Sequence, residues 1–75
     1  MKSRDTLPSR TIVHNLRSVR EAKHYSQEYV ARKMGISQEA YSRLELNETT
    51  PTLDRLLLIA RILDIRPEDM FFTRS

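Results

Sequence analysis

The 75-residue sequence contains no cysteine and no tryptophan, and it has a single glycine. Without cysteine there is no disulfide framework and no Cys/His zinc site, so helix packing or a partner chain must stabilise so short a chain. One glycine excludes glycine-rich phosphate loops and disfavours a turn-dense β-sandwich. No apolar run approaches the roughly 18 residues that a membrane span needs, and no apolar segment follows the basic start. We therefore expect neither a membrane span nor a secretory signal, and a cytoplasmic location.

Charge is unevenly distributed along the chain. There are 13 Lys and Arg and 10 Asp and Glu, which gives a formal net charge of +3. Residues 1–35 hold eight basic and three acidic residues, whereas residues 36–75 hold five basic and seven acidic ones. A basic half can attract a polyanion, although a mildly basic small domain explains the charge equally well.

The spacing of apolar residues and the signals at helix ends predict an all-α, five-helix domain. Residues 1–8 are polar and end at Pro8, and we expect them to form a flexible basic arm, with one domain over residues 9–75. No segment alternates apolar and polar residues, so no strand is predicted. The helices are predicted at residues 11–23, 27–34, 38–46, 53–63 and 67–72.

The second and third predicted helices are short and nearly adjacent. Ser26 and Ser37 are suited to cap their N-termini, and Gly35 lies where a left-handed residue would end the first of the two. Ala31 supplies a small side chain where the helices would touch. Two helices joined by so tight a turn are typical of a helix-turn-helix.

The fourth predicted helix is rich in leucine, and it has apolar residues on more than one side. We expect its inner face to be formed by Leu53, Leu56, Leu57, Ala60 and Leu63. Leu58 and Ile62 lie on the outer side and could join apolar residues near the chain end in a self-complementary surface. The alternative is that the fifth helix covers them within one monomer. The candidate dimer patch consists of Leu58, Ile62, Met70 and Phe72.

The segment SQEYVARKMGISQEAYSRLE, residues 26–45, together with residues 52–71, resembles the phage-repressor/Cro (XRE-type) helix-turn-helix DNA-binding domain. This resemblance covers about 60 of the 75 residues. It implies that residues 38–46 form a recognition helix whose N-terminal half enters the major groove of double-stranded DNA. It also implies a homodimer that reads two half-sites, and no cofactor.

The resemblance and helical spacing together suggest a role for individual residues. Tyr41 and Leu44 would point inward, which leaves candidate base contacts at Gln38, Glu39, Ser42 and Arg43. Helix N-termini and the loop before the fourth helix offer candidate phosphate contacts at Gln27, Asn47, Thr49, Thr50 and Thr52. In similar repressors, the positions of Arg20 and Glu45 form a structural ion pair, which we expect here, partly buried.

The sequence departs from the family pattern at three positions. His24 and Asn47 stand where glycine is frequent, and Glu48 stands where a basic residue commonly touches phosphate. Residues 37–48 contain one basic and three acidic residues, so weak or salt-sensitive binding by the monomer is expected. The basic residues near the N-terminus could compensate by following the DNA backbone: Lys2, Arg4 and Arg10.

Sequence-specific DNA binding by a small repressor-type regulator is the leading hypothesis. The alternatives are the antitoxin of a toxin–antitoxin pair, which would also bind a toxin, and a protein-interaction module that retains the fold. His14 and His24 have no nucleophile or metal-ligand set near them in the sequence, so we expect surface histidines, no metal site and no enzyme activity.

Overall fold

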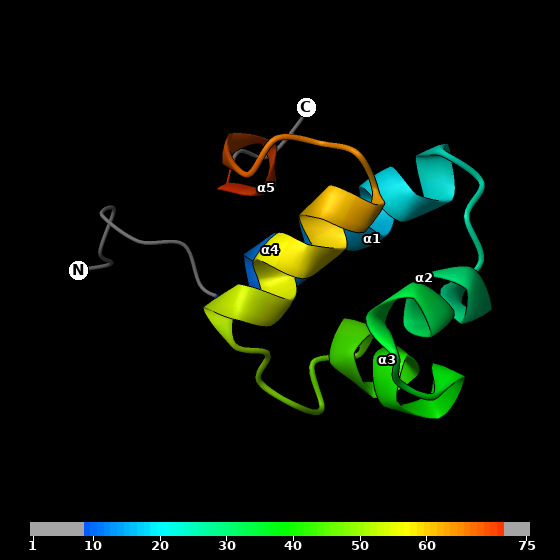
Figure 1. Ribbon diagram of the computed structural model, residues 1–75. Coiled ribbons are helices and arrows are strands. Elements are labelled where there is room, and N and C mark those ends of the chain that lie inside the picture. Colours follow the sequence, from blue (N-terminus) through cyan, green and yellow to red (C-terminus); the bar gives the residue numbers. More distant parts are fainter. Residues whose placement is uncertain (1–8, 72–75) are drawn as a thin grey trace.

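The computed structural model describes residues 9–71, and this part of the chain is helical with no strand (Figure 1). The all-α prediction is therefore confirmed, and the helix boundaries lie within a few residues of those predicted. The arm expected at residues 1–8 lies outside the described residues. The helices are α1 (Ser9–Ala22), α2 (Gln27–Met34), α3 (Gln38–Glu45), α4 (Leu53–Ile62) and α5 (Glu68–Phe71).

A serine or threonine caps the N-terminus of three of these helices. The side-chain oxygens of Ser26, Ser37 and Thr52 each accept a hydrogen bond from the backbone N–H three residues further on, at 3.0, 3.1 and 3.2 Å. Each hydroxyl thereby satisfies one of the backbone donors that have no partner in the first turn of a helix. The caps expected for the second and third helices are confirmed, and Thr52 caps α4 in the same way.

The four longer helices all end at a residue in the left-handed conformation. Gly35 has φ +78°, and His24, Asn47 and Asp64 have φ values of 63°, 62° and 60°. At each end, this residue's N–H donates to the carbonyl three residues earlier, and the next N–H donates to the carbonyl five residues earlier. These two bonds define a Schellman motif. The sequence predicted a left-handed end at Gly35. His24 and Asn47 stand where the family often has glycine, and Asp64 carried no such signal.

Helix α1 lies at the centre of the fold. It packs against α3, α4 and α5, while α2 packs against α3 and α4. Figure 1 shows α5 and α3 on opposite sides of α4. No helix within residues 9–71 is long and apolar enough to cross a membrane. The buried apolar core is formed by Ile12, Val13, Leu16, Val30, Ala31, Tyr41, Leu44, Leu56, Ile59, Ala60, Leu63 and Met70.

The inner face of α4 differs from the prediction at two leucines. Leu53 and Leu57 are 58% and 37% exposed, so their assignment to the core is wrong. Ile59 is fully buried in their place. The buried residues of α4 fall on one side of a helix with 3.6 residues per turn, and Leu57 lies about 100° around the helix from Leu56, away from that side. Leu53 lies nearer the core side, but it is the first residue of α4 and stays exposed at the end of the helix. The α4 residues that face the core are Leu56, Ile59, Ala60 and Leu63.

The candidate dimer patch is also corrected. Met70 is fully buried, and its backbone carbonyl accepts a 2.8 Å hydrogen bond from Asn15 Nδ2, so it belongs to the core of the monomer. Helix α5 packs against α1 and holds Met70 inside. Leu58 and Ile62 are half-buried, and Phe72 lies outside the described residues.

Candidate nucleic-acid interface

Helix α3 presents a polar side to the surface of the molecule. Tyr41 and Leu44 are buried, and they hold the inner side of the helix against the core. The four candidate base contacts consequently lie away from that side: Gln38, Glu39 and Arg43 are exposed and Ser42 is half-buried. The inward direction expected for Tyr41 and Leu44 is confirmed.

The first half of α3 borders a shallow polar hollow of about 430 Å³ that α2 helps to form. Three of the four candidate base contacts line it, together with the cap of α3 and one residue of α2. Arg43 is not among the lining residues. The structure therefore brings one candidate phosphate contact next to three candidate base contacts: the hollow is lined by Gln27, Ser37, Gln38, Glu39 and Ser42.

A buried ion pair joins the end of α3 to α1. Arg20 Nε donates to Glu45 Oε2 at 2.7 Å, and Arg20 Nη2 donates to Glu45 Oε1 at 3.1 Å. Parallel hydrogen bonds of this kind are stronger and more directional than a single contact. Only 10% of the Arg20 side chain and 3% of the Glu45 side chain are exposed. The pair is present as the resemblance implied, and it is more deeply buried than expected.

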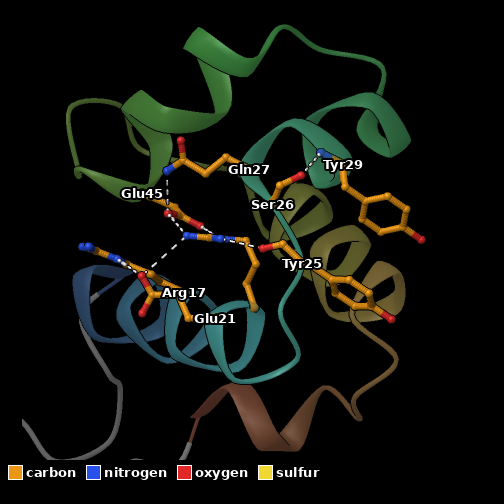
Figure 2. A network of polar contacts seen from close by, with 8 residues as sticks. Arg17, Glu21, Tyr25, Ser26, Gln27, Tyr29 and Glu45 are labelled. Atoms are coloured by element: carbon orange, nitrogen blue, oxygen red, sulfur yellow. Dashed lines mark hydrogen bonds and ion pairs between the residues drawn. The ribbon is translucent and has the colours of Figure 1, made fainter.

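Further hydrogen bonds complete this network (Figure 2). Arg20 Nη1 donates to the backbone carbonyl of Tyr25 at 2.7 Å, which ties the guanidinium to the loop between α1 and α2. Gln27 Nε2 donates to Glu45 Oε1 at 2.9 Å. Arg20 also lies 3.7 Å from Glu21, whose carboxylate is itself bonded to Arg17. The three helices α1, α2 and α3 are therefore held together by one carboxylate and its donors.

The ionisation of Glu45 reflects two opposed effects. Burial disfavours the charged carboxylate, but hydrogen bonds from Arg20, Tyr41 and Gln27 together with the charge of Arg20 outweigh it, and the pKa of Glu45 lies below its ordinary value. The pKa of Tyr41 lies above its ordinary value, chiefly because the phenol is buried and also because it is hydrogen-bonded to Glu45. Glu45 is consequently an anion and Tyr41 a neutral donor at neutral pH.

Two features of this network were not predicted from the sequence. Tyr41 was expected only as an apolar contact, and Gln27 only as a phosphate contact. Because the Gln27 carboxamide donates to Glu45, its orientation is set by the end of α3, 18 positions further along the chain. No local sequence signal indicates a contact across that separation.

The remaining candidate phosphate contacts lie between α3 and α4. Asn47, Thr49, Thr50 and Thr52 are all exposed. The Thr52 oxygen already accepts the capping bond of α4, so its hydroxyl proton remains able to donate. Glu48, the acidic residue in this segment, is exposed as well. The connection between α3 and α4 thus carries four candidate phosphate donors and one acidic side chain that would repel a phosphate.

The described residues contain no set of three His, Asp or Glu side chains arranged to hold a metal ion. His14 and His24 are exposed, as expected.

A contact between α1 and the end of α4 was not predicted from the sequence. Lys23 Nζ donates a hydrogen bond to the backbone carbonyl of Leu63 at 2.8 Å, which satisfies an acceptor at the C-terminus of α4.

Comparison with known proteins is consistent with this architecture. The chain is 36% identical over 50 residues to a Bacillus subtilis (strain 168) protein named as an uncharacterised HTH-type transcriptional regulator, YobD. The match covers 67% of this chain and 45% of that protein, so the chain spans less than half the length of this relative. No solved structure matches significantly. A family model described as helix-turn-helix matches residues 16–70, nearly three quarters of the chain. This chain belongs to the helix-turn-helix family, in its phage-repressor/Cro-like class.

Proposed function

We propose that this protein binds double-stranded DNA in a sequence-specific manner and acts as a transcriptional regulator of the repressor type. The observation that carries the proposal is the outer side of α3, where four polar side chains are presented by a helix whose opposite side is anchored in the core. A helix of this kind fits the major groove of B-DNA, and its N-terminal half is the part that approaches the bases.

Each candidate base contact has a chemistry suited to one base edge. Gln38 can bond adenine at N6 and N7, and Arg43 can bond guanine at O6 and N7. Glu39 can accept from N4 of cytosine, and Ser42 can bond either donors or acceptors. The hollow beside Gln38 and Glu39 supports this arrangement, because a projecting group of a base edge can enter it.

Phosphate contacts are proposed at the starts of α2 and α4, where free backbone N–H groups and the helix dipole favour an anion. Gln27 would contact a phosphate with the carboxamide proton that Glu45 does not accept. Asn47, Thr49, Thr50 and Thr52 would donate from the connection before α4. Glu48 opposes this contact, so weak binding by the monomer is expected at any salt concentration.

A homodimer is part of the proposal, because two copies read two half-sites about 34 Å apart and combine their binding energies. Met70 does not contribute to the interface, since it is buried in the monomer. Leu58 and Ile62, which are half-buried on α4, remain candidates.

The two glutamines of the interface provide a matched test. Gln38→Ala is expected to reduce the preference for A·T at one position of a selected site by about 1–3 kcal/mol, while binding to random duplex stays nearly unchanged. Gln27→Ala is expected to weaken binding to all sequences alike, because a phosphate contact carries no base information. Selection of bound DNA from a random pool, followed by gel-shift titration of both variants, measures these effects.

Two outcomes would contradict the proposal. If Gln38→Ala lowers binding equally on every sequence, the register of α3 in the groove is wrong. If micromolar protein does not retard any duplex at low salt, DNA binding is wrong. That result would favour a protein partner, such as a toxin, or an interaction module that keeps the fold.

A further inference from the structure

Helix α4 has an outward stripe that no other described element covers. Asp54, Leu57, Leu58 and Arg61 line one side of the helix, and the buried residues of α4 lie on the other. Three of the four are exposed and Leu58 is half-buried. We refer to these four residues as the α4 stripe.

The α4 stripe is symmetric in position and opposite in charge at its two ends. Asp54 and Arg61 lie equally far, along the chain, from the midpoint between Leu57 and Leu58. Asp54 and Arg61 are seven positions apart, a rise of about 10.5 Å along the helix, so the two charges do not reach each other within one chain. Neither has an ion-pair partner within residues 9–71. Each end of the stripe therefore carries a charge that forms no ion pair within the described residues.

We propose that a second copy of this chain docks on the α4 stripe with its own α4 antiparallel, the two-fold axis passing between Leu57 and Leu58. In this arrangement Leu57 meets Leu58 of the second copy, and Leu58 meets Leu57 of the second copy. Asp54 faces Arg61 of the second copy at one end, and the same pair recurs at the other end. The interface is isologous, as a closed dimer requires.

Charge decides the orientation. A parallel pair of α4 helices in register would put Asp54 against Asp54 and Arg61 against Arg61, and both contacts are repulsive. The antiparallel pair replaces both with attractions. The two leucines supply the apolar centre, and water is excluded there while the ion pairs stay at the rim, as is usual in interfaces.

The surroundings of the stripe leave room for a partner. It borders a hollow of about 610 Å³ that continues toward the connection between α4 and α5. Ile65 and Pro67 line that end of the hollow and extend its apolar wall. Asp64 adds a second acidic group there, one turn beyond Arg61. This hollow gives the partner's leucines open space beside the α4 stripe.

Charge reversal at the two ends of the stripe tests the interface. Asp54→Lys puts two cations opposite each other at both ends of a homodimer, and Arg61→Glu puts two anions there. Each variant alone is expected to dimerise roughly tenfold more weakly or worse, since two modest attractions become two repulsions. An equimolar mixture of the two variants restores both ion pairs and is expected to form a heterodimer about as stable as the wild-type dimer. Sedimentation equilibrium without DNA measures the dissociation constants, and native mass spectrometry identifies the heterodimer.

The mixture separates the interface from damage to α4 itself. Asp54 lies in the first turn of the helix, where an acid is favourable, so Asp54→Lys also weakens the helix locally. In the heterodimer, each chain still carries its own substitution and any weakening of α4 that the substitution causes. Recovery of dimerisation in the mixture can therefore come only from the restored ion pairs between the two chains. Arg55→Glu is the matched control: it reverses a charge on the same helix, away from the stripe, and is expected to leave the dissociation constant within about twofold.

Three results would overturn the proposal. A wild-type protein that stays monomeric at high micromolar concentration excludes the dimer. A dimer that none of the charge variants weakens uses a different surface, and variants that weaken it without rescue in the mixture exclude the antiparallel pairing. The inference rests on the dimer of the proposed function and not on DNA binding, and all measurements omit DNA, so failure here leaves the test of base readout untouched.

Discussion

Glu45 is the residue on which the polar interior depends. It accepts hydrogen bonds from α1 and α2 while belonging to the end of α3, so one carboxylate joins three helices. An ion pair that is almost fully buried adds little net stability, because desolvation of the two charges offsets their attraction. Removing one partner is nevertheless strongly destabilising, because the other charge is left buried and unpaired. This predicts different outcomes for single and double substitutions.

Arg20→Met is expected to lower the free energy of unfolding by about 3–5 kcal/mol, because Glu45 is left buried without a cation. Arg20→Met/Glu45→Met removes both charges and is expected to cost clearly less than the two single substitutions added together. Arg17→Met on the same helix breaks an exposed pair with Glu21 and is expected to change stability by no more than about 0.5 kcal/mol. Urea unfolding of the four variants measures these differences, and additive effects would contradict the buried pair.

Stability is expected to depend on pH through Glu45. The pKa of this carboxyl is lower in the folded protein than in the unfolded chain, where it is about 4.3. The resulting stabilisation is complete above the unfolded-state pKa and is lost as pH falls through the folded-state pKa. Below about pH 5, the wild type should therefore lose stability faster than Glu45→Gln, and the difference between them should shrink as pH falls. Urea titrations from neutral to acidic pH measure both curves. Parallel curves would show that Glu45 does not titrate differently on folding.

At the scale of the helices, the C-terminal ends of α1 to α4 share one backbone conformation, although the residues at these ends differ in type. Four helices end in the same left-handed motif, but only Gly35 is free of the steric penalty that a Cβ atom brings there. His24, Asn47 and Asp64 adopt that conformation nevertheless. Asparagine and aspartate tolerate it better than histidine because their short polar side chains can bond locally. His24 is therefore the most strained of these four ends.

Opposite substitutions at two helix ends test this ranking. Gly35→Ala is expected to destabilise the protein by about 1–2 kcal/mol, purely through backbone conformation, since no atom lies within 4 Å of the added Cβ. His24→Gly is expected to stabilise it by roughly 0.5–1 kcal/mol, because relief of strain exceeds the added entropy of the unfolded chain. Thermal unfolding followed by circular dichroism measures both. A destabilised His24→Gly variant would mean that the His24 side chain makes a contact worth more than the strain.

At the scale of the whole molecule, α5 completes the core rather than extending a surface. Asn15 and Met70 are 55 positions apart, and the bond between them fixes α5 on α1. A chain of 75 residues has few buried side chains to share its stability, so each one carries a large part of it. Met70 is among the largest that are fully buried.

Met70→Ala is expected to lower the free energy of unfolding by about 2–5 kcal/mol and the melting temperature by roughly 10 °C or more. Leu53→Ala is the matched control on an exposed apolar side chain, and its effect is expected to stay within about 0.5 kcal/mol. Differential scanning calorimetry compares the two. A small effect of Met70→Ala would contradict the role of α5 in the core.

Much of the candidate interface could be predicted without coordinates. Ser26, Gly35 and Ser37 define the turn by local chemistry, and helical spacing then gives the outer side of α3. The Arg20–Glu45 pair could be predicted only through the family resemblance, since nothing in a 25-residue separation indicates a contact. The involvement of Gln27 and Tyr41 could not be predicted, because their polar atoms meet Glu45 only after α2 and α3 have packed.

The approximate bounds of the helices and the presence of a helix-turn-helix could be predicted from local signals, because capping, apolar spacing and the left-handed glycine act over a few residues. Which apolar residues of α4 and α5 are buried depends instead on how the helices pack. Met70 turns inward and Leu57 outward, although both fit a helical apolar pattern. The reason is that a helix with apolar residues on several sides is oriented by the neighbours it packs against, and those neighbours come from distant parts of the chain.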